Sequence, residues 1–250
     1  MAEPLLQVDN LVKNFGGVRA TDDLTLDVRA GEVHALIGPN GAGKTTFIGQ
    51  LMGEIVPDAG AIRFAGAPLG GLDTPARVRL GIARTFQITQ LLDEDTALSN
   101  VALTIQAHQG HSFRFWKKAG SDATLFGPAQ ACLAAAGLGE RGAVPVRDLS
   151  HGEHKQLELA MALASEPRLL LLDEPMAGLG ASESRQMVDS LKRLKGKTAI
   201  LLVEHDMDAV FALADRISVL VYGKVIATGA PADIQANPQV RVAYLGEGDA

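Results

Sequence analysis

The segment from Gly38 to Thr45 fits the pattern G-x-x-x-x-G-K-[ST] at every position. Glycines let the backbone curl so that several N–H groups face one phosphate, and a helix that starts there adds positive dipole charge. In this pattern Lys44 supplies a charge to the β- and γ-phosphates, and the hydroxyl of Thr45 can coordinate Mg²⁺. The predicted nucleotide-binding residues of this segment are Gly38, Pro39, Asn40, Gly41, Ala42, Gly43, Lys44, Thr45 and Thr46.

Two adjacent acids, Asp173 and Glu174, follow the apolar run Leu169–Leu172. Ligands of open α/β sheets bind at the carboxyl ends of strands, so both acids are expected to face the phosphates. Successive side chains of a strand point to opposite faces, so the two acids need not share one role. Asp173 suits the shell of the magnesium ion through water, and Glu174 suits deprotonation of the attacking water, which contributes about 10²–10⁴ in rate.

Short apolar runs position these groups. Val33–Ile37, Leu169–Leu172, Ala199–Val203 and Ile217–Val221 are typical of strands buried on both faces, as in a parallel sheet covered by helices. Between the second and third runs, Ser182–Lys195 has apolar residues at helical spacing, an acid in its first turn and bases in its last. A strand, a helix and a strand of this length predict a βαβ unit.

The remaining chain is expected to form other elements. From about Thr89 to Val146 there is no strong strand pattern, which predicts a mostly helical insertion in an α/β core. The other expected elements are helices over Thr45–Leu51, Thr96–Gln106 and Pro128–Ala136, an antiparallel edge sheet from Leu5–Val28 and Ala61–Phe64, and a hairpin turn at Tyr222–Lys224.

Composition and charge exclude several classes of protein. The chain has 250 residues, 47% hydrophobic and 21% charged, which is typical of a globular protein and excludes wholesale disorder. The net charge of -6 argues against a general nucleic-acid binder. Cys132 is the only cysteine, so no intramolecular disulfide forms, as suits a reducing compartment. No apolar run approaches the roughly 20 residues that cross a bilayer, and Met1–Asn10 lacks the pattern of a signal peptide.

A third motif, Leu149–Glu153, reads Leu-Ser-His-Gly-Glu. Ser150 and Glu153 form an S-x-x-E capping box, which alone predicts only an ordinary helix start. The segment precedes the acidic pair by one short helix, however, and the phosphate loop lies upstream of both. In this order the motif resembles the signature of the ATP-binding cassette (ABC) ATPases, whose common form is Leu-Ser-Gly-Gly-Gln.

Three further positions match that family. Gln87 stands where the family has its Q-loop glutamine, which contributes to the magnesium site and to catalysis. His205 ends an apolar run as the family's switch histidine does, and Phe15 occupies the place of the aromatic residue that stacks on adenine. The resemblance extends from about residue 5 to 246 and implies that the catalytic residues are Lys44, Gln87, Glu174 and His205, with Thr45, Gln87 and Asp173 at the metal.

Within the family, the chain resembles the ATP-binding subunits of branched-chain amino acid importers. The matching segments are Phe15–Val18, Gly81–Gln87, Ala177–Leu179, Glu204–Met207 and Ala243–Glu247. The resemblance implies a P-loop NTPase (RecA-like) core with a parallel sheet, an antiparallel β subdomain and a helical subdomain inserted at about 89–165, all within one ATP-binding domain over residues 1–250. It also implies an ATPase on the cytoplasmic side of the inner membrane, peripheral to it, with ATP and Mg²⁺ as ligands.

The resemblance further implies a head-to-tail dimer with a second ATP-binding subunit, either an identical or a related chain. Ser150 and the N–H of Gly152 would close on the γ-phosphate bound to the other subunit. Integral membrane permease subunits would convert closure into transport, with a solute-binding protein as an indirect partner. One departure concerns the loop after Pro175, where Gly180 replaces the family's usual Asp, so backbone groups would have to substitute for that carboxylate.

Other functions stay open at the level of sequence. An importer ATPase for urea or amides has similar motifs. A soluble ABC ATPase would act on a cytosolic assembly without membrane partners, and a nucleotide-gated binding module would hydrolyse little, against which Glu174 and His205 argue. The aromatic and basic segment His111–Lys118 could touch a permease or a lipid surface, or form a half-exposed loop.

Overall fold

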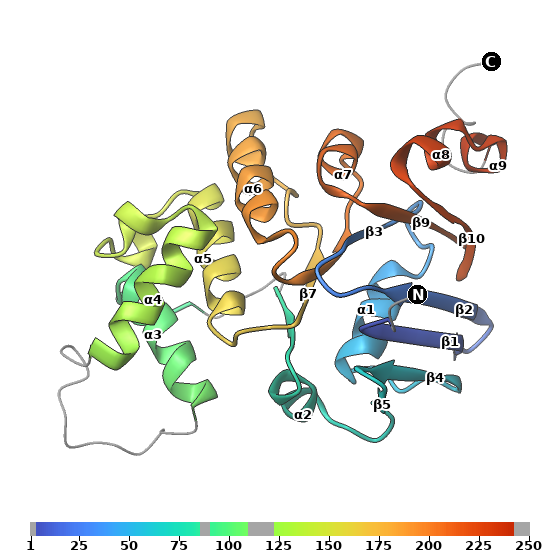
Figure 1. The fold of residues 1–250 in the computed structure, drawn as a ribbon, viewed down its shortest axis with the longest axis horizontal. Helices are drawn as coiled ribbons and strands as arrows, with labels where there is room; N and C mark the ends of the chain where they lie inside the picture. The colour runs from blue at the N-terminus through green and yellow to red at the C-terminus, as the bar shows by residue number, and fades with distance from the viewer. Residues whose placement is uncertain (1–3, 86–90, 110–122, 243–250) are drawn as a thin grey trace. The chain divides into compact units, whose positions relative to one another are not determined.

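The computed structural model describes residues 4–85, 91–109 and 123–242. Gln87, His111–Lys118 and Ala243–Glu247 lie outside the described residues. The chain divides into two compact units (Figure 1). The first consists of Met1–Ile82, Arg168–Glu174 and Lys195–Ala250, and the second of Ala83–Pro167 and Pro175–Leu194.

The part of the chain that the structure describes contains two β-sheets, which belong to the first unit except for Ala83 and Arg84. One has the order β2-β1-β4-β5, with antiparallel pairing throughout. The other has the order β10-β9-β3-β8-β7-β6, in which β9, β3, β8 and β7 are parallel. The strands are β1 (Leu6–Phe15), β2 (Val18–Val28), β3 (Val33–Ile37), β4 (Ala59–Phe64), β5 (Ala67–Pro68), β6 (Ile82–Arg84), β7 (Leu169–Asp173), β8 (Ala199–Val203), β9 (Arg216–Val221) and β10 (Lys224–Gly229).

All residues of β3, β7 and β8 are buried, as expected for strands covered on both faces. The predicted runs Val33–Ile37 and Ala199–Val203 coincide with β3 and β8, and β7 extends its predicted run by Asp173. The backbone angle φ is 46° at Tyr222 and 79° at Gly223. The chain turns back there as a hairpin between β9 and β10, which confirms the predicted turn. The antiparallel sheet near the N-terminus is likewise confirmed.

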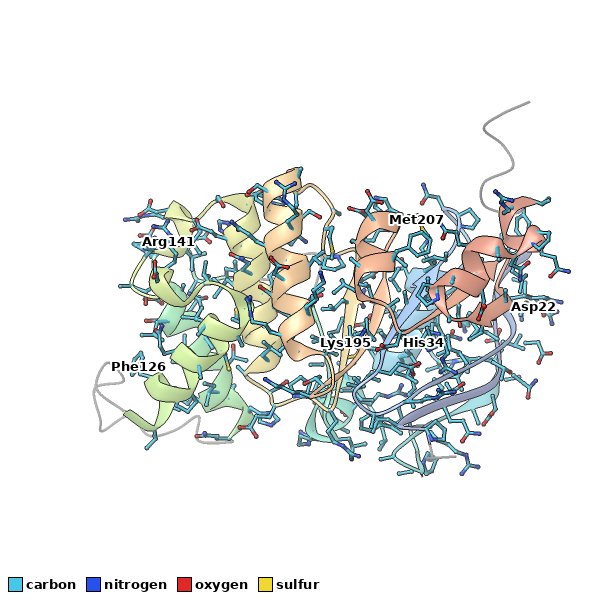
Figure 2. The ribbon with its side chains drawn as sticks, turned by 45° about the horizontal axis from the view of Figure 1, so that its top comes forward. Asp22, His34, Phe126, Arg141, Lys195 and Met207 are labelled. Carbon is cyan, nitrogen blue, oxygen red and sulfur yellow. The ribbon has the colours of Figure 1, made fainter. Side chains whose placement is uncertain are left out.

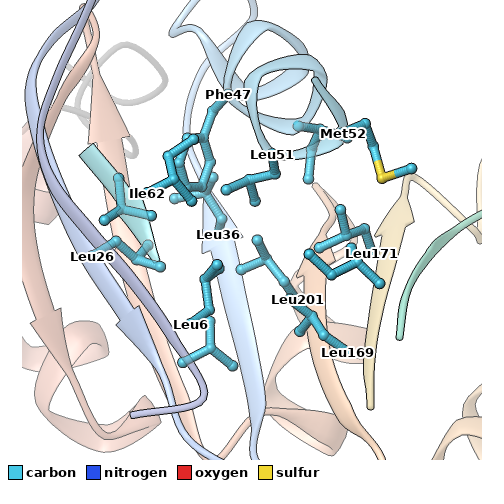
Figure 3. Close-up of a cluster of buried hydrophobic side chains, with 14 of the residues drawn as sticks. Leu6, Leu26, Leu36, Phe47, Leu51, Met52, Ile62, Leu169, Leu171 and Leu201 are labelled. Atoms are coloured by element: carbon cyan, nitrogen blue, oxygen red, sulfur yellow. The ribbon is translucent and has the colours of Figure 1, made fainter. Parts of the chain in front are cut away.

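Helix α1 follows the phosphate loop and packs between the two sheets. Phe47, Leu51 and Met52 lie in one apolar cluster with residues of both sheets (Figure 3). These contacts exclude water from the base of the helix, and burial of each such side chain contributes about 1.5–3 kcal/mol. The helices of the first unit are α1 (Lys44–Met52), α2 (Thr74–Arg79), α7 (Met207–Leu213), α8 (Pro231–Ala236) and α9 (Pro238–Val240).

The second unit is helical in its described part. Its elements are α3 (Ala97–His108), α4 (Ala123–Ala136), the 3₁₀ turns η2 (Gly139–Arg141) and η3 (Val146–Asp148), α5 (His151–Leu163) and α6 (Ala181–Leu194). The expected start of a helix at Pro128 is wrong, because α4 begins at Ala123 and contains the proline in its interior. A proline inside a helix loses one backbone hydrogen bond and crowds the carbonyl one turn earlier, and the burial of Ala129, Leu133 and Ala136 on α4 offsets this cost.

In the part of the chain that the structure describes, no helix combines the length and the apolarity needed to cross a bilayer. The segment expected as an insertion, about 89–165, falls within the second unit, which also takes in α6.

Candidate functional site

The phosphate loop joins β3 to α1 in the first unit. Gly43 is the residue before the helix, with φ 107, and no side chain caps the helix start. The first backbone N–H groups of α1 are therefore left for an external anion. A Cβ atom on Gly43 would lie 2.1 Å from the carbonyl oxygen of Ala20, and one on Gly38 would lie 2.1 Å from that of Leu220. Only glycine fits at these two positions.

The loop is tied to neighbouring strands by backbone hydrogen bonds. The N–H of Gly223 donates to the carbonyl of Ala42 at 2.9 Å, and the N–H of Asp22 donates to the carbonyl of Gly223 at 2.9 Å. The β9–β10 turn thus connects the loop to β2. The turn at Gly223 is predictable from the sequence, but its contact with the phosphate loop is not.

The side chain of Lys44 is buried in the loop. Its Nζ atom donates to the carbonyl of Gly38 at 2.6 Å and to that of Pro39 at 3.0 Å. Burial lowers the pKa of Lys44, and the carboxylates of Glu174 and Asp173 act in the opposite direction. The negative charges of both acids therefore favour the charged form of Lys44.

The sheet register explains how the acids reach the loop. Val203 of β8 pairs with Leu36 of β3 on one side and with Asp173 of β7 on the other. Neighbouring strands lie about 4.8 Å apart, so the ends of β3 and β7 are about 10 Å apart across the sheet. Strand β8 lies between them, so the loop after β3 and the acids at the end of β7 stand at the same edge of the sheet, two strands apart.

Asp173 and Glu174 differ in backbone conformation. Asp173 is the last residue of β7 and is buried. Glu174 has φ 51, a left-handed conformation rare for a residue with a side chain, and its N–H donates to the carbonyl of Val203 at 2.8 Å. The strand ends before Glu174, so the alternation of side chains expected for the pair does not extend to it.

His205 follows β8 at the same edge. Its Nδ1 atom lies 3.8 Å from Oε1 of Glu174 and 3.7 Å from Oε2 of Glu204. The carboxylate of Glu204 is buried and accepts hydrogen bonds from the backbone N–H groups of His205 and Asp206 at 2.8 and 3.2 Å. Glu204 stands beside His205 in the sequence, yet no motif indicates a role for it; in the structure its carboxylate holds the backbone that carries the histidine.

The residues expected at the magnesium ion fit that metal. The hydroxyl-bearing Thr45 is exposed in the first turn of α1, and Thr46 beside it is half-buried. The described residues include no group of three His, Cys, Asp or Glu side chains that could hold a metal by themselves. Thr45 and Asp173 therefore suit an ion that takes its remaining oxygen ligands from phosphate and water, as Mg²⁺ does. Gln87 lies outside the described residues.

Phe15 lies at the end of β1, at the hairpin that leads into β2. Its side chain is 49% exposed, and the Nζ atom of Lys13 lies 5.5 Å from the centre of its ring. Ala20 of the same strand pair lies against Gly43 of the phosphate loop. The exposed ring of Phe15 therefore offers a stacking surface for a base.

The signature segment lies in the second unit, at the start of α5. Ser150 caps the helix, and the side chains of Ser150 and Glu153 make both bonds of the capping box, which confirms that prediction. Although burial raises the pKa of Glu153, the N–H of Ser150 and the guanidinium of Arg141 (Figure 2) hold it below its usual value. The imidazole of His151 reaches to within 3.0 Å of where a Cβ atom on Gly178 would lie.

Residues 21–177 match the family model described as ABC transporter. The chain belongs to the ABC transporter family. Residues 224–250 match a second model, described as Branched-chain amino acid ATP-binding cassette transporter. The predicted family and fold class, and an ABC ATPase as the activity, are thereby confirmed.

Two curated ABC relatives cover the whole chain. The high-affinity branched-chain amino acid transport ATP-binding protein LivG of Salmonella typhimurium is 37% identical, over 99% of this chain and 100% of its own length. The protein BraF of Pseudomonas aeruginosa, which has the same description, is 35% identical over 99% of this chain and 100% of its own length.

Solved ABC cassettes share the fold. The ADP conformation of MJ1267, an ATP-binding cassette of an ABC transporter, matches with a TM-score of 0.85 and 29% identity, over 98% of this chain and 100% of that one. A dimeric post-hydrolysis state of the cassette MJ0796, bound to ADP and Pi, matches with a TM-score of 0.75 and 25% identity, over 90% of this chain and 98% of that one.

Proposed function

We propose that this ABC ATPase powers an importer for branched-chain amino acids. The observation that carries the proposal is the full-length similarity to LivG and BraF, whose names specify this solute class. The match of residues 224–250 to the branched-chain amino acid model supports it from a separate part of the chain. The partners would be integral permease subunits and, through them, a solute-binding protein, with this chain on the cytoplasmic face of the membrane.

Residues 1–250 would act as one ATP-binding domain with its helical insertion at about 89–165. The loop residues 38–46 would bind the phosphates of ATP, and Phe15 would stack on the adenine. Lys44 would exchange its two carbonyl partners for phosphate oxygens. Thr45, Asp173 and Gln87 would hold Mg²⁺, which when bound neutralises charge on the transferred phosphate.

Glu174 would accept a proton from the attacking water, and His205, 3.8 Å away, would orient the carboxylate and the γ-phosphate. A second subunit, identical or related, would contribute Ser150 and the N–H of Gly152. ATP then favours the closed dimer because it makes contacts there that it does not make in the open one. Hydrolysis removes these contacts and the dimer opens, which drives the permease.

The experiment is ATP-dependent uptake in proteoliposomes that contain this chain with the permease subunits and the binding protein of the proposed importer. Uptake of radiolabelled leucine, isoleucine or valine is expected, and a complex with Glu174→Gln serves as the inactive control. If urea or an amide is taken up and leucine is not, the solute class is wrong. If the chain hydrolyses ATP but retains no permease on purification, an importer is the wrong assembly.

A further inference from the structure

The carboxylate of Glu183 lies at the N-terminus of α5, although it belongs to the first turn of α6. Its Oε1 atom accepts hydrogen bonds from the N–H of Gly152 at 3.2 Å and from the hydroxyl of Ser150 at 3.4 Å. A Cβ atom on Gly152 would lie 2.5 Å from the same oxygen. The carboxylate therefore fills the space directly above the helix start. All of these residues belong to the second unit.

These two donors are the groups that the proposed function assigns to the γ-phosphate of the partner's ATP. A carboxylate is an anion with acceptor oxygens, and the start of α5 favours any anion through its free N–H groups and its dipole. Phosphate and Glu183 cannot accept from the same N–H and hydroxyl at once. In the monomer the side chain of Glu183 takes the place of the phosphate.

Glu183 also holds the loop that departs from the family pattern. Its Oε2 atom accepts a hydrogen bond from the N–H of Gly180 at 3.1 Å. The usual Asp of that loop is missing, and the carboxylate three residues later bridges the loop backbone and the signature segment in its stead. If phosphate displaced Oε1 of Glu183 from Ser150 and Gly152, its Oε2 atom could keep the hydrogen bond from Gly180.

We propose that Glu183 is an intramolecular competitor of the γ-phosphate, which raises the ATP concentration needed to close the dimer. The inference rests on the proposed function, in which Ser150 and Gly152 act on the ATP of a second subunit. Glu183 does not contact reacting atoms in this role. It regulates closure by occupying the donors until a triphosphate, with its larger charge, replaces it.

The charge of Glu183 can be removed with little change of shape by Glu183→Gln. A hydrogen bond to a neutral acceptor contributes less than one to a charged acceptor, so the competitor is weakened, and the ATP concentration at half-maximal dimerisation should fall by about 3- to 10-fold. Glu183→Asp keeps the charge on α6 but shortens the side chain by one methylene group, which moves the carboxylate away from Ser150 and Gly152, so it should lower that concentration too.

The test is sedimentation velocity of the full chain across an ATP titration, in the Glu174→Gln background that prevents hydrolysis. Asp189→Asn is the matched control, because it removes one charge from the exposed face of the same helix. Isothermal titration at protein concentrations below dimerisation should give one ATP affinity for all variants. A variant that folds poorly would bind ATP more weakly, whereas a variant in which Glu183 no longer occupies Ser150 and Gly152 would keep the wild-type ATP affinity.

The outcomes are distinct. A lower ATP requirement for both Glu183 variants, with Asp189→Asn unchanged, supports the competitor. An equal or higher requirement overturns it and leaves the proposed composite site standing. If no variant dimerises at saturating ATP, the composite site between copies of this chain fails, and the inference about Glu183 fails with it.

Discussion

The Nδ1 atom of His205 lies 3.8 Å from the Oε1 atom of Glu174, where β8 and β7 end side by side. Different contacts hold the two residues at this distance. Glu174 is set by a left-handed turn and a backbone bond to Val203, and His205 by the buried carboxylate of Glu204. Both backbones are thus held independently of any ligand, which suits a pair that must be in place before the nucleotide arrives.

Glu174→Gln is expected to reduce turnover by about 10²- to 10⁴-fold, because the amide cannot accept a proton from the attacking water. ATP affinity should stay near that of the wild-type protein, and the ATP-bound dimer should persist. Steady-state phosphate release and an ATP titration measure the two effects. Asp208→Asn, in the first turn of α7, is a control for loss of one acid in the same unit. Turnover at the wild-type rate in Glu174→Gln would reject the assigned role.

Lys44→Ala is expected to weaken ATP binding by at least tenfold, since a buried ammonium that can pair with phosphate is lost. Calorimetric titration with ATP measures the dissociation constant. Lys197→Ala removes the same type of charge from an exposed position of the same unit and should leave that constant unchanged. An unchanged constant in Lys44→Ala would refute the assignment of the loop.

The buried strands of the core could be predicted because the local sequence of each is a short apolar run. The run that became β8 is apolar at every position, the run that became β3 is apolar except at His34, and the predicted bounds of both coincide with the strands. The start of α4 could not be predicted in this way. A proline usually marks the first turn of a helix, whereas Pro128 lies inside α4. The bond that proline removes is a local cost, whereas the apolar packing that compensates for it is tertiary.

The same distinction between local sequence patterns and tertiary contacts applies to the candidate site. The phosphate loop and the two acids carry patterns specific enough to be identified from their residue types and order. The contacts of Glu183 with Ser150 and Gly152 join positions more than 30 residues apart, and no local pattern indicates them. As a residue of the first turn of a helix, Glu183 suggested only an ordinary interaction with the helix dipole.

Ser150→Arg should abolish hydrolysis while each subunit still binds ATP. A long cation at the start of α5 blocks closure on a second subunit, whereas the phosphate loop that binds the nucleotide belongs to the first unit and is unchanged in this variant. The measurement pairs an ATP titration with an assay of phosphate release. Arg185→Ala, an exposed change on α6, is expected to alter neither. Normal hydrolysis by Ser150→Arg would show that one subunit suffices.

Gly43→Ala should destabilise the folded chain more than Gly41→Ala. Both glycines have positive φ, but a Cβ atom would lie 2.1 Å from the carbonyl oxygen of Ala20 at Gly43 and would meet nothing within 4 Å at Gly41. The left-handed backbone alone costs about 1 kcal/mol, and the clash adds about 1–3 kcal/mol. Urea unfolding without nucleotide measures the difference. Equal losses of unfolding free energy in the two variants would contradict the tight contact between the loop and β2.

His34 of β3 should make the stability of the chain depend on pH. Its side chain is buried in the first unit (Figure 2), with Nε2 2.8 Å from Oγ of Ser218 and Nδ1 3.3 Å from a guanidinium nitrogen of Arg216. Burial, with the positive charge of Arg216, lowers the pKa of His34 to about 4 from the usual 6.5, although Asp27 acts in the opposite direction.

Between pH 6.5 and pH 4 the unfolded chain therefore binds a proton at His34 that the folded chain does not bind. The free energy of unfolding should fall by about 2 kcal/mol from pH 7 to pH 5 through this residue, and the loss should level off below pH 4. Urea unfolding of the wild-type protein and of His34→Gln gives the two slopes. The variant should show the shallower slope and the exposed control His108→Gln the wild-type slope. Equal slopes in all three proteins would mean that His34 is not the titrating group.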